Sequence, residues 1–212
     1  MDNPVMIFGA GFIGRAAKEI FEGNNNVVYC FLDDNKNLHS SLIDNVTVMG
    51  STDDDGFLKL IGKKCDAFVA VDDNKIKKNL VKMLQDVRHV QPVNAIHQSA
   101  RLASSASIGH GNFIDMGAAI GAGSEIGNHC LLHPNAVVSA GAKVGDYVQV
   151  GAGAIINSGA EVADEVFIGS GVIIISGISI GKGARIGAGS VVVAPVKAGE
   201  TVFGNPAQKV ST

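Results

Sequence analysis

The sequence has no Trp and only 2 Tyr and 9 Phe in 212 residues, so aromatic side chains make up 5% of the chain. A large core must therefore be built from small and branched aliphatic residues, which favours a repetitive arrangement. Cysteine is scarce and odd in number, and Cys30, Cys65 and Cys130 are widely spaced, which excludes a disulfide-built secreted scaffold. The net charge is only −3 and 46% of residues are hydrophobic, which together exclude a disordered chain.

Other signals are missing as well. The charged residues form no basic patch, so nucleic acid is not an expected partner. No apolar run approaches the roughly 18 residues of a membrane span. The first residues, MDNPVMIFGAG, do not form a signal peptide. We therefore expect a cytoplasmic protein with free thiols.

Glycine, by contrast, is abundant and unevenly placed. Of the 27 Gly residues, twenty lie in residues 101–212, whereas seven of the eleven aromatic residues lie in residues 1–100. The chain length permits two domains. We predict one domain over residues 1–97 and a second over residues 98–212.

The first segment alternates short apolar runs with helical patterns. The predicted strands are Val5–Ala10, Val27–Leu32, Val46–Met49, Ala67–Val71 and Val90–Val93. The predicted helices are Arg15–Gly23, Phe57–Ile61 and Lys75–Val87, with Ser51 or Thr52 as a cap of the second. This alternation predicts an α/β domain of the Rossmann-like, doubly wound kind with a parallel sheet.

A glycine fingerprint, Gly9-Ala-Gly11-Phe-Ile-Gly14, follows the first strand and opens the first helix. Small residues let a backbone approach an anion, and a helix N-terminus supplies amide donors. Asp33 and Asp34 follow Gly14 by 19 and 20 residues, the distance at which an acidic residue binds a ribose. We interpret the motif as a cradle for a nucleotide or nucleotide sugar. The alternative is that the glycines only tighten a strand–helix turn and that the aspartates are a polar strand end.

The second segment carries a strict repeat. Sixteen aliphatic residues stand six positions apart without an insertion, and a mostly small residue follows each of them by four positions. The aliphatic residues are Leu102, Ile108, Ile114, Ile120, Ile126, Leu132, Val138, Val144, Val150, Ile156, Val162, Ile168, Ile174, Ile180, Ile186 and Val192. A period of six fits neither an α-helix nor a hairpin meander, and it predicts a parallel β-helix whose coils stack these aliphatic side chains.

The repeat resembles the left-handed β-helix of the hexapeptide acyltransferases. The order of IFGAGFIG, FLDDN, VAVDDNKIKK, the hexads and the closing GNPA (Gly204 to Ala207) is similar to the NeuD/PglD-type sugar acetyltransferases. The resemblance implies about five coils of three hexads, a homotrimer, and acetyl-CoA as cosubstrate in the groove between neighbouring prisms. It also implies a nucleotide-linked or sialic-type sugar as the acceptor, bound in part by Asn74 of the first domain.

The chain departs from this family at one expected catalytic position. The family carries a His followed by an acidic residue near the middle of the repeat, and the matching residues here are Ala140 and Gly141. Neither side chain can move a proton. A shifted alignment would place Asp164 at the position of the His.

His133 and Asp115 could replace the missing pair, because they are 18 residues apart and each follows a buried aliphatic residue. They would face outward on adjacent coils about 4.8 Å apart. An Asp that orients a His is the arrangement of a general base. We therefore predict His133 as a relocated base with Asp115 as its partner; the alternative is an exposed or trimer-contact histidine.

The resemblance also places the acyl-CoA groove along the later coils. Its backbone would be that of Gly169, Gly187, Ala188 and Gly189, and Gln149 stands where relatives carry a His near the thioester. The cations available to the phosphates are Lys182, Arg185, Lys197 and Lys209.

A metal site is not expected. His129, Tyr147 and Glu165 form a column at 18-residue spacing, as do His110, Asn128, Asp146 and Asp164. Hexapeptide carbonic anhydrases bind zinc through two His five residues apart and a third upstream, whereas His129 and His133 are four apart. We therefore predict an acetyl-CoA-dependent sugar N- or O-acetyltransferase for surface glycan synthesis. The alternative is a catalytically impaired relative that retains ligand binding.

Overall fold

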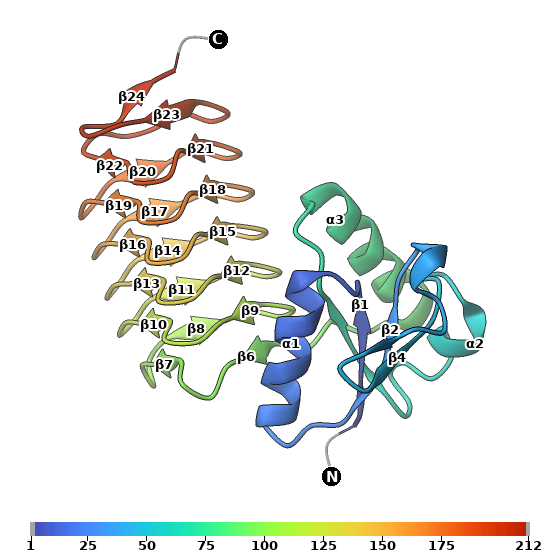
Figure 1. The fold of residues 1–212 in the computed structure, drawn as a ribbon. Helices are drawn as coiled ribbons and strands as arrows, with labels where there is room; N and C mark the ends of the chain where they lie inside the picture. Colours follow the sequence, from blue (N-terminus) through green and yellow to red (C-terminus); the bar gives the residue numbers. More distant parts are fainter. Residues whose placement is uncertain (1–2, 211–212) are drawn as a thin grey trace. The chain divides into compact units, whose positions relative to one another are not determined.

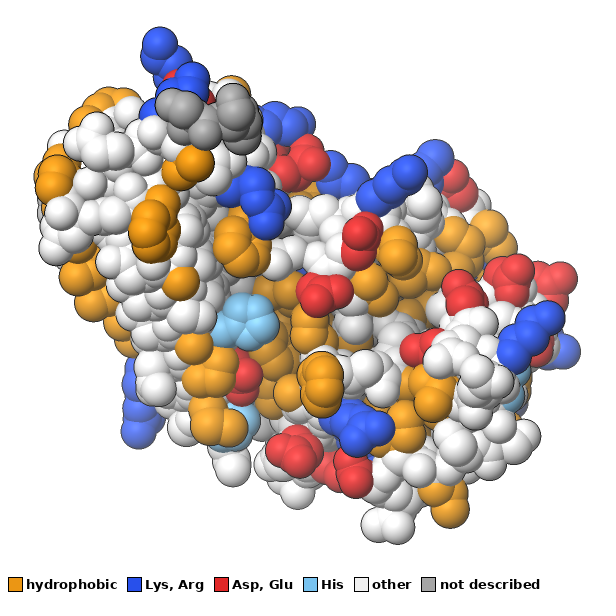
Figure 2. All heavy atoms as spheres, turned by 45° about the horizontal axis from the view of Figure 1, so that its top comes forward, with side chains coloured by type: hydrophobic (Ala, Val, Ile, Leu, Met, Phe, Trp, Pro, Cys, Tyr) orange, Lys and Arg blue, Asp and Glu red, His pale blue; other side chains and the backbone are white. Residues whose placement is uncertain are grey.

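A computed structural model describes residues 3–210 and divides the chain into two compact units, Met1–Gln98 and Ser99–Thr212. The first unit is an α/β domain and the second is a stack of short strands (Figure 1). Acidic and basic side chains are interspersed on the face shown in Figure 2, in keeping with the small net charge. The described residues contain no helix long and apolar enough to cross a membrane.

The first unit is built on a five-stranded sheet of order β3-β4-β2-β1-β5. All neighbouring strands are parallel except β3, which runs antiparallel to β4. The strands are β1 (Val5–Phe8), β2 (Val28–Leu32), β3 (Leu42–Ile43), β4 (Val46–Gly50) and β5 (Asp66–Val69). The four parallel strands are thus ordered third, second, first and fourth, which matches the first four strands of the Rossmann order.

Three α-helices and two short turns connect or follow these strands. They are α1 (Phe12–Gly23), η1 (Lys36–Leu38), α2 (Asp55–Leu58), α3 (Asn74–Met83) and η2 (Leu84–Arg88), a π-helical turn. The predicted first helix is confirmed, although it starts three residues earlier. The predicted third helix is interrupted, because its last turn continues as η2 rather than as α-helix.

Two predictions for the first unit are wrong. Val90–Val93 forms no strand, because Pro92 lacks an amide hydrogen for a ladder, although the Val93 amide donates to the Ala67 carbonyl at 2.9 Å. The cap of α2 is Asp54, whose side chain accepts from the Gly56 amide, and not Ser51 or Thr52. Thr52 is engaged elsewhere, since its amide and hydroxyl both donate to Asp34.

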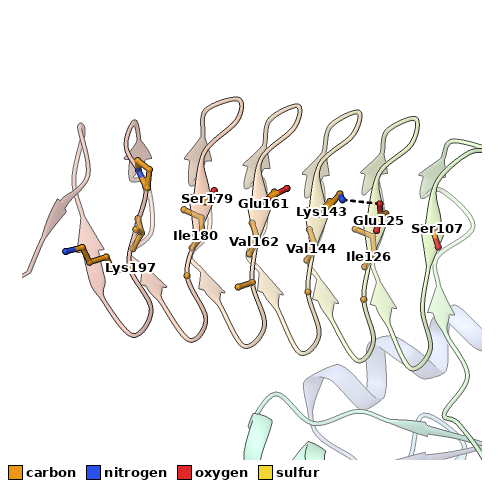
Figure 3. Close-up of a pocket in the computed structure, with 16 residues that line it drawn as sticks. Ser107, Glu125, Ile126, Lys143, Val144, Glu161, Val162, Ser179, Ile180 and Lys197 are labelled. Carbon is orange, nitrogen blue, oxygen red and sulfur yellow. Dashed lines mark ion pairs between the residues drawn. The ribbon is translucent and has the colours of Figure 1, made fainter.

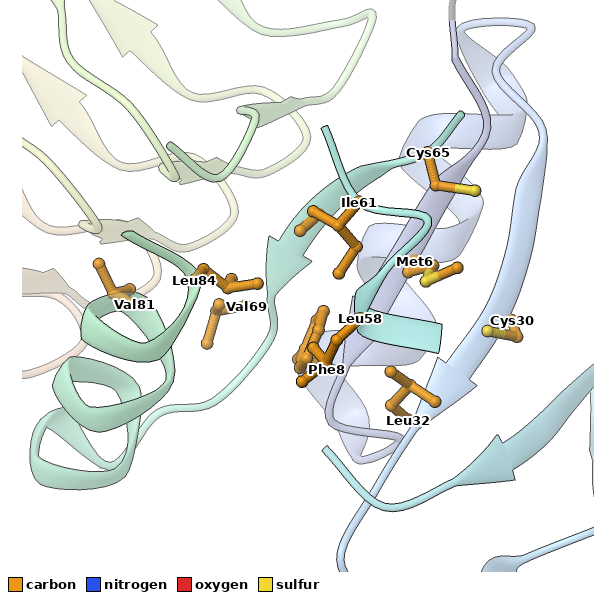
Figure 4. Packing of buried hydrophobic residues seen from close by; sticks show 11 residues of the cluster. Met6, Phe8, Cys30, Leu32, Leu58, Ile61, Cys65, Val69, Val81 and Leu84 are labelled. Atoms are coloured by element: carbon orange, nitrogen blue, oxygen red, sulfur yellow. The ribbon is translucent and has the colours of Figure 1, made fainter. Parts of the chain in front are cut away.

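The core of the first unit lies between the sheet and its helices (Figure 4). Met6 and Phe8 of β1 and Leu32 of β2 are fully buried there, together with Leu84 after α3. Cys30 and Cys65 belong to the same cluster and are free thiols. Burial, and secondly the neighbouring Cys65 thiol, raises the pKa of Cys30 to about 12.

In the second unit each of the sixteen predicted aliphatic residues ends a two-residue strand. Strands 18 residues apart pair in parallel, so each coil contributes one strand to each of three sheets. The first sheet contains β7 (Arg101–Leu102), β10 (Ala119–Ile120), β13 (Val137–Val138), β16 (Ile155–Ile156), β19 (Ile173–Ile174) and β22 (Val191–Val192). The second contains β8 (Ser107–Ile108), β11 (Glu125–Ile126), β14 (Lys143–Val144), β17 (Glu161–Val162) and β20 (Ser179–Ile180). The third contains β9 (Phe113–Ile114), β12 (Leu131–Leu132), β15 (Gln149–Val150), β18 (Phe167–Ile168) and β21 (Arg185–Ile186).

The interior of this β-helix is narrow and apolar. The aliphatic column is buried from Ile114 to Val192, and small side chains such as Ala136 and Ala154 are fully buried between the coils. The corners need a left-handed backbone, and Gly141 with a φ of 67° shows why glycine is frequent there. The strands β23 (Thr201–Phe203) and β24 (Gln208–Lys209) form an antiparallel pair after the last coil, and β6 (Ala95–Ile96) lies just before the second unit begins.

Candidate functional site

The glycine fingerprint occupies the turn between β1 and α1, at the carboxyl end of the sheet. Gly9 has a φ of 106°, and a Cβ on it would lie 2.8 Å from the carbonyl oxygen of Ala70, which follows β5. A Cβ on Gly14 would collide with the carbonyl oxygen of Gly9, whereas the space beside Gly11, the N-cap of α1, is open. Gly9 and Gly14 thus serve close packing, while Gly11 borders open space. In open α/β sheets ligands bind at this edge, where the strand order reverses between β1 and β5.

Asp33 and Asp34 lie at the same edge, but both carboxylates bind the protein itself. Asp33 accepts from the amides of Ala10 and Asn35, each at 2.8 Å. Asp34 accepts from the amide and hydroxyl of Thr52 at 2.9 and 2.8 Å. The two side chains therefore hold the loops after β1, β2 and β4 in place. The role predicted for them as sugar or base acceptors stays a prediction.

Asn74 also lies at this edge, as the first residue of α3. The preceding residue, Asp73, caps the helix by accepting from the Ile76 amide at 2.9 Å. Because β1 and β5 are parallel neighbours, the helices that follow them both begin at the carboxyl edge of the sheet. The predicted substrate residues of the first unit are therefore brought together by topology.

His133 and Asp115 occupy matching positions of adjacent coils, as their spacing predicts. Leu132 pairs with Ile114, and each of these residues ends its strand. His133 and Asp115 directly follow them. Asp115 is not exposed, however: its side chain folds onto the backbone, and one carboxylate oxygen accepts from the Met116 amide at 2.7 Å. The ring of His133 lies 6.3 Å from that of Phe113 in an edge-to-face arrangement.

A pocket of about 120 Å³ on the third sheet brings three predicted residues together. His133, Gln149 and Gly169 line it, with the ring of Phe167 as its apolar side. The Arg185 guanidinium lies over that ring, 4.7 Å from its centroid. An imidazole, a carboxamide and an apolar ring on one wall suit a small polar group attached to an apolar chain.

The remaining predicted cosubstrate residues do not line this pocket. The amide of Gly187 donates to Val202, and a Cβ on Gly187 would collide with the Phe203 ring, so the tail covers it. Lys209 pairs with Glu200 at 3.2 Å. The Lys197 amide, followed by Lys209, lowers the pKa of Glu200. Ala188 and Gly189 form the corner after β21, and the roles predicted for these residues stay predictions.

A second and larger hollow, which the sequence reasoning missed, runs along the outer face of the second sheet (Figure 3). Its volume is about 700 Å³, and Gly127, Gly145 and Gly181 are among the residues that line it. Glu125 and Lys143 form an exposed ion pair of 3.6 Å beside it. The signal in the sequence is the small residue that follows the aliphatic residue in the hexads of this sheet, which is Gly in four of the five and Ala163 in the other.

Comparison with known proteins places both units. Residues 4–84 match the PglD N-terminal domain. Residues 105–140 and 123–158 match the bacterial transferase hexapeptide (six repeats), and residues 162–194 match the hexapeptide repeat of succinyl-transferase. The chain thus combines a PglD N-terminal domain with hexapeptide repeats. The predicted Rossmann-like domain followed by a left-handed parallel β-helix is thereby confirmed.

Solved structures resemble this chain over its whole length. PerB from Caulobacter crescentus, in complex with CoA and GDP-perosamine, is 28% identical with a TM-score of 0.89, covering 100% of this chain and 99% of that one. A mutant of perosamine N-acetyltransferase from the same organism, with one His replaced by Asn, gives a TM-score of 0.91 at the same identity and coverage. The acetyltransferase domain of PglB from Neisseria gonorrhoeae is 26% identical with a TM-score of 0.90, covering 99% and 100%. A search of curated protein sequences gives no match.

The position at which the PglD type is expected to carry its His is occupied by Ala140. Ala140 lies exposed at the corner after β13, and its carbonyl accepts from the Gly159 amide. The methyl group supplies no proton acceptor. If the chain uses a side-chain base, that base comes from another position of the molecule.

The column of His129, Tyr147 and Glu165 is a corner in the left-handed conformation, with φ values of 59°, 59° and 61°. The rings of His129 and Tyr147 lie 4.9 Å apart, and Glu165 pairs with Lys182 at 3.2 Å. Burial, followed by the nearby Asp146 and Glu165, raises the pKa of Tyr147, which keeps its hydroxyl protonated. Within residues 3–210, no group of three or more His, Cys, Asp or Glu side chains could hold a metal ion.

Proposed function

We propose that this chain is an acetyltransferase that moves the acetyl group of acetyl-CoA to the amino group of a nucleotide-linked sugar. The observation that carries the proposal is the match over the full length to PerB, whose structure holds CoA and GDP-perosamine. A relative from Neisseria gonorrhoeae is solved with acetyl coenzyme A. The amine is favoured over a hydroxyl because perosamine N-acetyltransferase acts on nitrogen. As in the resemblance, we place the reaction in surface glycan synthesis.

The pocket on the third sheet is the proposed site of transfer. The volume of about 120 Å³ has room for the acetyl thioester end of the cosubstrate, since one water occupies about 30 Å³ of liquid. Phe167 would contact the apolar thioester chain, and the carboxamide of Gln149 can donate to its carbonyl oxygen. The lone pair of a neutral amine attacks the carbonyl carbon, the carbon–sulfur bond breaks, and the sulfur leaves as the CoA thiol.

His133 is the proposed general base. A ring nitrogen of His133 would accept the proton released when the amide bond forms and return a proton to the departing sulfur. Asp115, one coil away and held by the Met116 amide, would orient the imidazole as a positioning residue. This assignment gives a proton acceptor on the pocket wall, where the corner of Ala140 has none.

We propose that the chain forms a homotrimer and that the outer face of the first sheet is the interface between its subunits. The outward residues there are apolar along successive coils: Val137 and Ile155 are half-buried, while Ile173 is 37% exposed. A hollow of about 380 Å³ continues this face toward Ser139. A continuous apolar sheet face is stabilised by contact with further copies of the chain.

The alternative function is a relative that binds the ligands without acetyl transfer. Ala140 favours it, because the expected His is missing at that position. A thermal-shift experiment with acetyl-CoA and with UDP-, dTDP- and GDP-linked amino sugars tests binding. Stabilisation by both ligand classes supports the site in each unit. No stabilisation by acetyl-CoA at millimolar concentration contradicts the transferase, and turnover then separates an enzyme from a binding protein.

A further inference from the structure

The turn that carries the glycine fingerprint also carries an exposed aromatic side chain. Phe12 is the first residue of α1, directly after the N-cap Gly11, and it is 93% exposed. Among the large hydrophobic residues described, this is the highest exposure. An aromatic ring exposed to water loses the large stabilisation that burial would give, so the exposure of Phe12 is not explained by folding stability.

A second exposed apolar side chain lies at the same edge of the sheet. Ile76, in the first turn of α3, is 51% exposed. The helices α1 and α3 begin after the neighbouring parallel strands β1 and β5, and the backbone of Gly9 packs against Ala70. The first turns of α1 and α3 therefore each carry an exposed apolar side chain. Both turns lie at the carboxyl end of the sheet, where the strand order reverses between β1 and β5.

We propose that Phe12 is the platform on which the nucleobase of the sugar carrier stacks. This inference rests on the proposed binding of a nucleotide sugar and names the residue that recognises its base. Phosphate groups belong at amide donors such as those that begin α1, and a planar base with two apolar faces needs an aromatic or aliphatic surface nearby. Phe12 supplies this surface on the α1 side, and the exposed Ile76 of α3 adds a second apolar side chain at the same edge of the sheet.

Substitution of Phe12 tests the proposal, measured as the affinity of the native full-length chain for GDP and UDP by calorimetry. Phe12→Ala is expected to weaken binding roughly 5- to 150-fold, the range that base–aromatic stacking spans. The affinity for inorganic pyrophosphate, which has no base, should not change. Phe12→Tyr should bind as the unaltered chain does. The matched control is Leu42→Ala. Leu42 is an apolar side chain that is 70% exposed on β3, the outer strand on the side of the sheet away from β5.

The absence of Trp from the chain gives a second readout. Phe12→Trp introduces a single indole, whose fluorescence should change when GDP or UDP is added and stay constant with pyrophosphate. If Phe12→Ala binds GDP and UDP as tightly as the unaltered chain, the platform is overturned while the proposed nucleotide binding stands. If the unaltered chain binds neither nucleotide, both the platform and the proposed nucleotide binding are overturned.

Discussion

At the scale of single residues, the buried thiols give the first unit a distinct response to pH. Cys30 is fully buried in the core, and its pKa is raised to about 12, mainly by burial and secondly by Cys65. The pKa of this thiol in the folded protein exceeds the unfolded value of 9.0, so below pH 9 the thiol is protonated in both states and does not lower the free energy of unfolding. Above that pH the unfolded chain ionises first, so stability is lost progressively between pH 9 and about 12.

We therefore expect the free energy of unfolding to fall between pH 8 and pH 10 by on the order of 1 kcal/mol from Cys30. Denaturant unfolding at the two pH values measures this for the unaltered chain and for Cys30→Ala. The variant should be less stable at both pH values but should lose less on the change to pH 10. Equal losses in the two proteins would contradict the assignment to Cys30.

His133 carries the residue-scale prediction for the chemistry. His133→Ala should lower the rate of acetyl transfer by roughly 10²- to 10⁴-fold, the contribution of a general base, and added imidazole should restore part of the rate. The assay is release of the CoA thiol at saturating acetyl-CoA. His110→Ala, an exposed histidine of the same unit, is the matched control and should retain full rate. Full activity of His133→Ala would remove the histidine from the mechanism.

At the scale of elements, the coils depend on glycine for two different reasons. A Cβ on Gly145 would lie 2.8 Å from the Asp164 amide of the next coil, closer than side chains approach. Gly141, in contrast, has open space around it and needs only the left-handed backbone, which Asn also tolerates. The same residue type thus serves close packing at one corner and backbone conformation at another.

Gly145→Ala should therefore destabilise the β-helix by about 1–3 kcal/mol, the usual cost of an overpacked interior. Gly141→Asn should be close to neutral. Thermal unfolding of the two variants beside the unaltered chain makes the comparison. A larger loss of thermal stability in Gly141→Asn than in Gly145→Ala would contradict the roles assigned to these two glycines.

How far the elements can be predicted depends on how local their causes are. The hexads could be predicted in full, because each hexad repeats the same burial of one aliphatic residue and one mostly small residue. The strand predicted at Val90–Val93 does not form. The prediction rested on apolar content alone, whereas a strand also needs backbone hydrogen bonds, and Pro92 has no amide hydrogen to donate. Asp33 could be placed at the sheet edge from its spacing, but its bond to the Ala10 amide depends on a fold that brings residues 23 positions apart together.

At the scale of the whole molecule, the apolar outer face of the first sheet predicts assembly. Ile173→Asp should convert the expected trimer into monomers, since it places a charge on an apolar contact that must otherwise be desolvated. Light scattering after size exclusion gives the mass. Leu42→Asp, the same change at an exposed position of the first unit, should leave the trimer intact. A trimer that survives Ile173→Asp would move the interface to another face.

The central claim is acetyl transfer to an amine on a nucleotide-linked sugar, and one assay tests it most directly. Purified protein is incubated with acetyl-CoA and a panel of GDP-, UDP- and dTDP-linked 4-amino sugars, and both products are followed. The three cysteines are buried, which keeps the background low when CoA thiol is titrated on the native protein. We predict equimolar release of CoA thiol and formation of an N-acetylated sugar nucleotide for at least one member of the panel. Binding of acetyl-CoA without transfer to any member would contradict the claim.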